Sequence, residues 1–323
     1  MQKNSASGNI MVVGSLAYDR IMDFPGRFGD HILPEKIHAL NVSFFVQKLE
    51  ERFGGTAGNI AYTLALLGEH PCIVSAAGKD FAPYEAWLLR HGVNIDFVKR
   101  NHIELTASAY IITDRARNQI TGFHPGAMRN KNVRIGLSKR LAKPVSLAII
   151  SPGNPKDMLA AAEECGREKI PYIFDPGQQI PVLDPQALRG AMAGAMMVIG
   201  NDYEMALIAQ KTNLSKLTLL KKRKTVITTF GEEGSEKATA EKTYRIPALR
   251  VKKAVDPTGA GDAYRAGLIA ALAKRRSWEV AGRIAATVAS FAVEHYGTQE
   301  HHISWETVRV RYKKYFPSPR VDF

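Results

Sequence analysis

Cysteine is scarce in this chain: only Cys72 and Cys165 occur, far apart in a sequence of 323 residues. Two cysteines at this separation form neither the spacing of a zinc site nor a disulfide framework. Long hydrophobic runs are also lacking, because stretches such as 145–150 have the length of a strand and are too short to span a bilayer. The N-terminal residues are polar and do not form an export signal. We therefore expect a cytoplasmic protein with no membrane partner.

Acidic residues are outnumbered, with 31 Asp and Glu against 44 Lys and Arg and a net charge of +13. Basic clusters occur at 221–224, 274–276 and 309–314. This surplus suits nucleic acid, and it suits a polyanionic nucleotide substrate equally well. No zinc-finger spacing, RNA-recognition signature or heptad-linked basic helix accompanies it. Nucleic acid is therefore a disfavoured partner, and a solvated basic surface is the default interpretation.

Strand-like and helix-like segments alternate along most of the chain, which predicts a mostly parallel sheet covered by helices on both faces. The expected strands are 10–14, 72–76, 147–151, 172–175, 196–200 and 225–230. The expected helices are 60–67, 83–91, 157–168, 185–193, 203–209, 261–274 and 278–295. Internal repeats and low-complexity linkers are lacking, so we expect residues 1–323 to form a single α/β domain.

Two segments depart from this alternation. Residues 20–50 and 97–126 contain β-forming stretches at 37–46, 107–113 and 119–123, the last two separated by a charged turn that is typical of a hairpin. We expect these segments to form a small β lid inserted in the domain. An exposed edge of such a lid could pair two subunits or serve only as a cover, so both a monomer and a homodimer through the lid stay open.

The most informative stretch is Asp256-Pro257-Thr258-Gly259-Ala260-Gly261-Asp262, which is followed by apolar residues at helical spacing. A helix that begins inside the Gly-Ala-Gly turn presents unpaired N–H groups at its positive end, which is where anions bind. A carboxylate beside a bound phosphate is unfavourable unless it has a task, and Asp262 is suited to take a proton from an attacking hydroxyl. The alternative is that Asp262 only caps a packed helix, the usual meaning of a lone Gly-x-Gly.

Other candidate residues also follow predicted strands, at the sheet edge where ligands gather in open α/β folds. Asp19 comes after the first strand, and the glycines of 54–59 would let a ligand approach the backbone beside Asn59. Asn201 and Glu204 are either neighbouring polar ligands or a helix cap with a first-turn acid. The segment 228–234 either admits a nucleotide or shapes a hairpin.

Gly54-Gly55-Thr56-Ala57-Gly58-Asn59 together with 256–262 closely resembles the two signatures of the ribokinase-like family, also called the PfkB carbohydrate kinases. The resemblance continues through Asn201-x-x-Glu204 and Thr229-x-Gly231-x-x-Gly234 and covers about residues 10–300. It implies a three-layer α/β/α domain with a mostly parallel central sheet and a small inserted β lid. Residues 37–46 and 123–128 look most like the bacterial adenosine kinases.

The resemblance implies an ATP- and magnesium-dependent kinase that phosphorylates the 5′-hydroxyl of a nucleoside, with adenosine favoured. A sugar kinase acting on ribose, fructose or a related sugar is the alternative. A non-catalytic nucleotide- or nucleic-acid-binding protein is a third possibility, which the intact Asp262 argues against.

Individual roles are carried over by position. The resemblance implies a catalytic base at Asp262 and an anion hole at Gly259, Ala260 and Gly261. It implies sugar-hydroxyl contacts at Asp19, Gly55 and Asn59. It also implies a nucleotide-binding turn at Thr229, Gly231 and Gly234, and a magnesium ion organised largely through water by Asn201 and Glu204.

Further expectations concern a monovalent cation and the lid aromatics. Asp256 belongs to a loop that holds potassium in several members, but Pro257 replaces the threonine found in many of them, so K⁺ stays an open expectation. Phe123 is a candidate to stack on a purine or to fill the lid's own core. The histidines His295, His301 and His302 are interpreted as surface residues.

Overall fold

The computed structural model describes residues 8–32, 38, 41–116, 118–129, 141–221 and 224–317. Its centre is a nine-stranded sheet in the order β13-β12-β11-β10-β9-β8-β1-β4-β5. The seven strands from β11 to β5 at the right-hand end of this order pair in parallel. In this sheet, β12 and β13 pair antiparallel. The strands are β1 Asn9–Val13, β4 Pro71–Ala77, β5 Asn94–Arg100, β8 Val145–Ile150, β9 Tyr172–Phe174, β10 Met197–Asn201, β11 Thr225–Thr229, β12 Ser235–Ala238 and β13 Thr243–Ile246.

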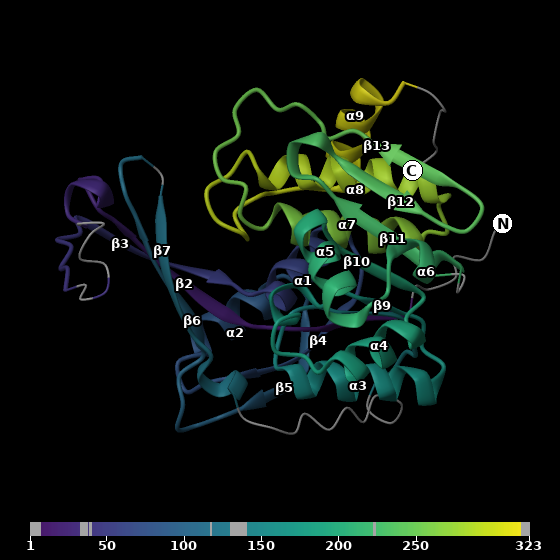
Figure 1. Cartoon of the computed structure of the whole chain (residues 1–323), viewed down its shortest axis with the longest axis horizontal. Helices are drawn as coiled ribbons and strands as arrows, with labels where there is room; N and C mark the ends of the chain where they lie inside the picture. The colour runs from purple at the N-terminus through teal and green to yellow at the C-terminus, as the bar shows by residue number, and fades with distance from the viewer. Residues whose placement is uncertain are drawn as a thin grey trace.

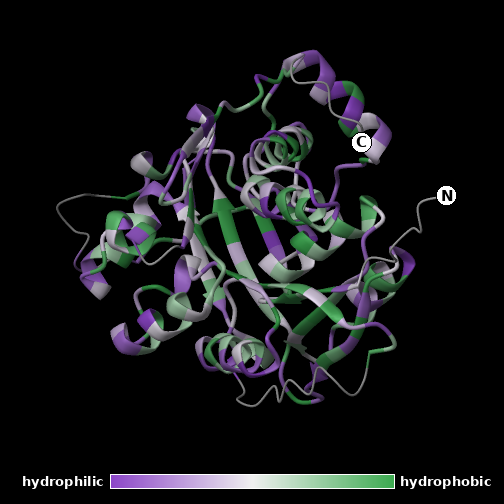
Figure 2. Ribbon diagram, turned by 90° about the vertical axis from the view of Figure 1, so that its right-hand side faces the viewer, coloured by the Kyte–Doolittle hydropathy of each residue, from purple (hydrophilic) through white to green (hydrophobic). Residues whose placement is uncertain are grey.

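Helices cover both faces of this sheet because successive residues of each central strand point to opposite sides. In β1, Ile10 and Val12 join one buried cluster, whereas Met11 and Val13 join the other. The first cluster packs against α1 Thr56–Leu66, α2 Ala82–Arg90, α7 Ala260–Ala273, α8 Trp278–Ala292 and α9 Trp305–Tyr315. The second packs against α3 Pro155–Glu168, α4 Pro185–Gly194, α5 Asp202–Thr212 and α6 Lys216–Lys221. Figure 2 shows the apolar central strands enclosed by these helices, and the predicted three-layer fold is confirmed.

A second, four-stranded sheet stands beside the main body, on the left in Figure 1. Its order is β3-β2-β6-β7, formed by β3 Lys48–Gly54, β2 Ala17–Asp23, β6 Ala107–Thr113 and β7 Gln119–His124. We call these four strands the small sheet. β2 continues the chain directly from the end of β1, and β3 leads directly into α1, so the small sheet is anchored at the sheet edge that carries the candidate residues.

The boundaries of this sheet differ from the sequence prediction in two places. Residues 97–100, expected in the lid, belong to β5 of the large sheet, because buried Phe97 and Val98 face its two core clusters. Residues 41–46, expected to be a strand, are irregular, and the strand lies later, at β3. Four of the seven residues in Lys48–Gly54 are charged, and the half-buried positions include Glu50 and Arg52, so β-propensity does not reveal this strand.

Some predicted features fall outside the described residues: the polar start at 1–7, positions 33–37, 39 and 40 of the lid segment, residue 117 of the hairpin turn, and positions 222 and 223 of a basic cluster. Helix α9 was not predicted, since its apolar residues are few among basic ones; Val308 and Tyr312 nevertheless bury its inner face. Among the described residues, no helix has the length and hydrophobicity needed to cross a bilayer.

Candidate active site

The candidate residues gather at the carboxyl ends of the parallel strands, where the strand order reverses between β8 and β1. The start of α1 is fixed there by hydroxyl groups: Thr56 Oγ1 donates to the Pro152 carbonyl at 2.8 Å and lies 3.0 Å from Ser151 Oγ. Gly55 precedes this helix with φ +86°, and a Cβ at this position would lie 2.6 Å from the Ser15 carbonyl oxygen. The backbone of residues 54–56 is therefore held against the ends of β1 and β8, and only glycine fits at 55.

Asp262 lies in the first turn of α7 and is partly buried. Its Oδ2 accepts a hydrogen bond from Asn59 Nδ2 at 2.8 Å, which joins the first turns of α1 and α7. Burial raises the pKa of Asp262 from 3.8 to about 6, although Arg265 and the Asn59 amide both favour the carboxylate. A carboxylate with this pKa is ionised at neutral pH and is a stronger base than an exposed aspartate.

Asp19 is the second carboxylate of the site and comes from β2 of the small sheet. Burial raises its pKa to about 6, and the negative charges of Asp262 and Asp256 add to the effect. Gly54 leaves the space that the Asp19 carboxylate fills, because a Cβ there would lie 2.4 Å from Asp19 Oδ2. The small sheet thus brings an acceptor of hydrogen bonds toward Asp262, in the manner needed to hold hydroxyl groups.

A buried ion pair lies beneath Asp262. Arg265 Nε donates to Asp175 Oδ2 at 2.5 Å, and Arg265 Nη1 donates to the Gly261 carbonyl at 3.0 Å. Burial by itself would lower the pKa of Arg265, but Asp175 and then Asp262 raise it above its ordinary value. Sequence reasoning missed this pair, although Arg265 follows Asp262 by one helical turn, a spacing that signals contact.

The start of α7 is shaped by the preceding loop. Gly259 caps the helix with φ +80° and lies against Thr298, which a Cβ at 259 would approach to 3.0 Å. The Ala260 N–H donates to the Pro257 carbonyl at 3.1 Å, so this hydrogen bond occupies one of the three backbone donors assigned to the anion hole. Asp256 accepts from the Thr258 N–H at 2.9 Å and from the Gly297 N–H at 3.0 Å.

Asn201 and Glu204 form a capping box at the start of α5. Asn201 Oδ1 accepts from the Glu204 N–H at 2.7 Å, and Glu204 Oε2 accepts from the Asn201 N–H at 2.8 Å. The helix-cap interpretation of this pair therefore holds. Burial raises the pKa of Glu204, and the charge of Asp175 adds to it, so this carboxylate faces the site's other acids.

Several carboxylates share this region with one guanidinium. Asp175 and Glu204 both act on the pKa of Asp262, and Asp175 Oδ1 is buried without a hydrogen-bond partner in the described structure. Such an excess of negative charge suits a divalent cation. The described residues contain no group of three or more His, Cys, Asp or Glu side chains that could ligate a metal directly. A magnesium ion held mainly through water and phosphate does not need such a group.

The nucleotide-turn residues lie at the end of β11. Thr229 pairs with Asn201 of β10 and Ser235 of β12, and the chain then turns through 231–233. Gly234 has φ +97°, and a Cβ there would lie 2.2 Å from the Ile246 carbonyl oxygen. Gly231 has φ +57° with open space around it. The turn thus combines one glycine required by close packing with one that faces open space.

Phe123 lies on β7 and is 52% exposed. In the small sheet Arg52, Asp19, Ala109 and Phe123 form one row of paired residues on four neighbouring strands, so their side chains share a face. Asp19 and Phe123 are two strands apart, about 10 Å at the usual strand spacing. Ala109, whose side chain is a single methyl group, is the residue between them.

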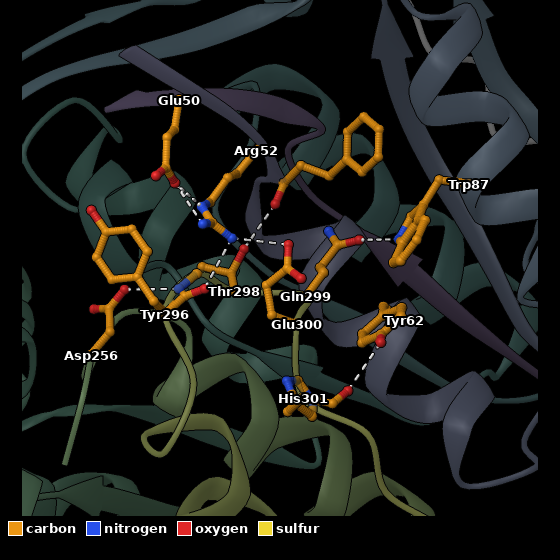
Figure 3. Close-up of polar contacts among 12 residues, drawn as sticks. Glu50, Arg52, Tyr62, Trp87, Asp256, Tyr296, Thr298, Gln299, Glu300 and His301 are labelled. Carbon is orange, nitrogen blue, oxygen red and sulfur yellow. Dashed lines mark hydrogen bonds and ion pairs between the residues drawn. The ribbon is translucent and has the colours of Figure 1, made fainter. Parts of the chain in front are cut away.

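The segment 296–301 joins the small sheet, α1, α2 and the loop before α7, as Figure 3 shows. Thr298 Oγ1 donates to the Phe53 carbonyl at 2.9 Å, and Arg52 forms an ion pair with Glu300 at 3.1 Å. Gln299 accepts from Trp87 Nε1 at 3.0 Å. Sequence reasoning assigned no role to this segment, because its partners are distant in the chain.

The prediction that His301 is a surface residue is wrong. Its side chain is fully buried, and Nε2 lies 3.0 Å from Thr63 Oγ1. Burial lowers its pKa to about 4, with a further contribution from His295 and His302, so the ring is neutral at physiological pH. A structural role in holding α1 follows from this burial.

A cavity of about 580 Å³ lies elsewhere, between α8, α9 and residues 249–252. None of the candidate site residues lines it. The assignment of the site therefore depends on its residues and their position at the strand ends.

Comparisons with known proteins agree with this geometry. Residues 8–305 match the model of the pfkB family of carbohydrate kinases. The chain is 32% identical over 286 residues to the nucleoside kinase of Methanocaldococcus jannaschii, covering 87% of this chain and 92% of that protein. It is 26% identical to the ribokinase of Bacillus subtilis over 301 residues, covering 90% and 94% of the two chains.

Solved structures give the same result. Burkholderia thailandensis nucleoside kinase in complex with inosine is similar with a TM-score of 0.85 and 35% identity, over 95% of this chain and 98% of that one. Its complex with ADP-inosine gives a TM-score of 0.83 at 35% identity, over 97% and 98% of the two chains.

Proposed function

Since this chain belongs to the pfkB family of carbohydrate kinases and is a phosphotransferase with a hydroxyl acceptor, we propose that it transfers the γ-phosphoryl group of ATP to the 5′-hydroxyl of a nucleoside. The observation that carries the proposal is the convergence of Asp262, Asn59 and Asp19 at the strand ends, with an aromatic side chain on the same face of the small sheet. Adenosine is the acceptor that the sequence favours. Inosine, which is bound in the Burkholderia kinase structure, is the alternative acceptor.

Asp262 is the proposed base. Its raised pKa keeps it ionised at neutral pH while giving it more affinity for a proton than an exposed aspartate has. As the acceptor oxygen attacks the phosphorus, its proton passes to Asp262, and the donor nucleotide leaves as ADP. The N-terminal turn of α7 is the proposed anion hole, where backbone donors and the helix dipole stabilise the charge that develops on the transferring phosphoryl group.

The row across the small sheet supports a nucleoside rather than a free sugar. A ribose whose hydroxyls bind Asp19 and Gly55 would extend its base across Ala109 toward Phe123. The ring of Phe123 is exposed on that face and free to stack, whereas a monosaccharide would not reach it. Closure of this sheet over the ligand would exclude water, the competing acceptor. Lid movement is part of the proposal.

Magnesium belongs to the same proposal. The excess of carboxylates around Asp175, Glu204 and Asp262 fits a divalent cation, and Asn201 with Glu204 would organise its water ligands. When bound with ATP, the ion supplies neutralisation of phosphate charge. The nucleotide itself would lie along Thr229, Gly231 and Gly234. Potassium at the Asp256 loop stays an expectation from the resemblance alone.

A ribokinase-like sugar kinase is the second candidate, because the matched family is described by carbohydrate substrates and a ribokinase is among the relatives. The exposed Phe123 favours the nucleoside over this alternative.

The Asp262→Asn variant tests the proposed base. We expect kcat to fall at least ~10²-fold, because the proton of the attacking hydroxyl loses its acceptor. Inosine and ADP should still bind, as measured by isothermal titration calorimetry. Near-normal turnover by Asp262→Asn would show that the base lies elsewhere.

A further inference from the structure

We propose that Gln299 is a positioning residue for phosphoryl transfer: it fixes the orientation of the Asn59 amide, which in turn presents an N–H donor to Asp262. The expected effect on catalysis rests on the proposed function. The hydrogen bonds that orient Asn59 belong to the folded chain and do not depend on it. Figure 3 shows Gln299 in the segment that joins the small sheet, α1 and α2.

The direction of the hydrogen bonds begins at Trp87. An indole nitrogen only donates, so the atom 3.0 Å from Trp87 Nε1 must be the carbonyl oxygen of Gln299. The amide nitrogen of Gln299 then points the other way, toward Asn59 Oδ1 at 3.0 Å and the Tyr84 hydroxyl at 2.6 Å. Tyr84 accepts there because its own proton goes to the Gly54 carbonyl at 2.9 Å.

The same logic continues into the active site. Since Asn59 Oδ1 receives the Gln299 donor, Asn59 Nδ2 is the atom that faces Asp262 Oδ2 at 2.8 Å. A flipped Asn59 amide would place two oxygens in contact at Asp262 and two amide nitrogens in contact at Gln299. The chain from Trp87 through Gln299 and Asn59 therefore admits one arrangement, with a donor at its catalytic end.

Burial makes this arrangement hard to replace by solvent. Gln299 is 2% exposed, Asn59 is 5% exposed and Tyr84 is fully buried. The space beside them is filled as well: a Cβ at Gly58 would lie 1.8 Å from the Tyr84 hydroxyl and 3.1 Å from Gln299 Nε2. Water cannot easily enter to satisfy a polar atom left unpaired there.

The consequence for Asp262 has a definite sign. A donor to the carboxylate stabilises its ionised form and lowers its pKa, and the Asn59 amide acts in this direction. Other charged groups face Asp262 from neighbouring elements: Arg265 from its own helix, Asp175 after β9, Glu204 from α5 and Asp19 from β2. A Gln299 variant leaves all of these in place, so a change in titration reports the Asn59 donor.

The first experiment compares wild type with Gln299→Met, which keeps side-chain length and removes both hydrogen-bonding groups. We expect the acid limb of the kcat/KM profile for inosine to move upward by roughly 0.5–1 pH unit, since one unit corresponds to 1.36 kcal/mol and a donor to a charged group contributes on this scale. The loss of kcat/KM in Gln299→Met relative to wild type should shrink toward high pH, where Asp262 is ionised in both proteins. An unchanged acid limb would overturn the proposal and leave Gln299 a packing residue.

A double-variant cycle tests whether Gln299 acts through Asn59. In the Asn59→Ala background, Gln299→Met should cause no further shift of the acid limb; an additive shift contradicts the proposed path. Trp87→Phe, which removes the indole N–H at the start of the chain together with part of the ring system, should cause a smaller shift in the same direction. Trp305→Phe is the matched control, because its indole donates to the Leu67 carbonyl, away from the site.

A readout independent of turnover separates this proposal from the proposed function. The Asp262 side-chain ¹³C resonance, assigned by its loss in Asp262→Asn, should titrate at higher pH in Gln299→Met, and by more than the resonance of Asp19, which the Asp262 charge influences. Wild type that phosphorylates no nucleoside would sink the proposed function alone. An unshifted Asp262 titration in folded Gln299→Met would sink the positioning role alone. If that variant does not fold, the Trp87→Phe titration decides instead.

Discussion

Asp262 and Asp19 are two carboxylates of the candidate site that the fold affects in the same way. Each has its pKa raised to about 6 because the surrounding protein removes water, and Asp19 is raised further by the nearby charges. Each is therefore ionised at neutral pH against an energetic cost to the fold. Two carboxylates that interact titrate as a pair, so an acid limb near pH 6 in the profile of kcat/KM against pH would reflect both groups.

The energetic cost of ionising Asp262 in the folded protein can be measured through the free energy of unfolding. Below pH about 4 the Asp262 carboxyl is protonated in both states, and between about 4 and 6 the folded form keeps a proton that the unfolded form has lost. The free energy of unfolding contributed by this group therefore falls as pH rises through that window. We expect Asp262→Asn to stabilise the protein by at most roughly 3 kcal/mol above pH 6, with the gain vanishing toward pH 4.

Urea unfolding of both proteins between pH 4 and 7.5 measures this gain. The exposed Asp30→Asn is the matched control and should change stability little at any pH. A gain for Asp262→Asn that does not depend on pH would contradict the raised pKa.

Single residues were predictable from sequence where a local motif carried them. The pairing of Asn59 with Asp262 brings together two residues that were selected separately, each from its own glycine-rich motif. Asp175, Gln299 and His301 were not found, because their importance comes from contacts between segments that are distant in the chain. Only the fold creates those contacts.

At the scale of secondary structure, α5 begins with a capping box that is also the proposed magnesium site. The two roles can be separated, because α9 begins with a second capping box formed by Ser304 and Thr307. Asn201→Ala and Ser304→Ala should each cost about 1 kcal/mol of stability through the lost cap. Only Asn201→Ala should raise the Mg²⁺ concentration needed for half-maximal activity. Identical magnesium dependence in both variants would leave Asn201 with the cap role alone.

Strand β7 provides the test of base recognition. Phe123 and Ile120 are both exposed, and their odd separation places them on opposite faces of the strand. Phe123→Ala should raise KM for inosine about 10-fold, or roughly 1.4 kcal/mol, through lost stacking, without affecting turnover of free ribose. Ile120→Ala should leave both unchanged. Equal effects of Phe123→Ala on inosine and ribose would argue against stacking.

Elements were predicted well where apolar residues were consecutive and less well where one face is solvated. The buried strands of the large sheet appear in the sequence as short apolar runs. Strand β3 and helix α9 carry many charged side chains, so their buried positions are too few to be recognised before the partner surface is known. β5 was placed in the wrong sheet because strand patterning does not specify a partner.

At the scale of the whole molecule, the small sheet is built from two insertions, one of which leaves the large sheet at the point where the strand order reverses. β2 and β3 lie between β1 and α1, at the site, whereas β6 and β7 follow the edge strand β5 and join the small sheet because β6 pairs with β2. β2 carries Asp19, and β3 leads directly into α1, so short connections link this part of the small sheet to the candidate site. The net charge of +13 suits a protein that receives a polyanionic nucleotide.

The most direct measurement of the central claim compares acceptors. ADP release is followed with adenosine, inosine, guanosine, cytidine, ribose and fructose in parallel, and the phosphorylated position is identified by phosphorus NMR. We predict a nucleoside 5′-monophosphate as product. The kcat/KM for a purine nucleoside should be at least ~10²-fold above that for any free sugar, because only the nucleoside has a base that can contact Phe123. A higher kcat/KM for ribose or fructose would contradict the account.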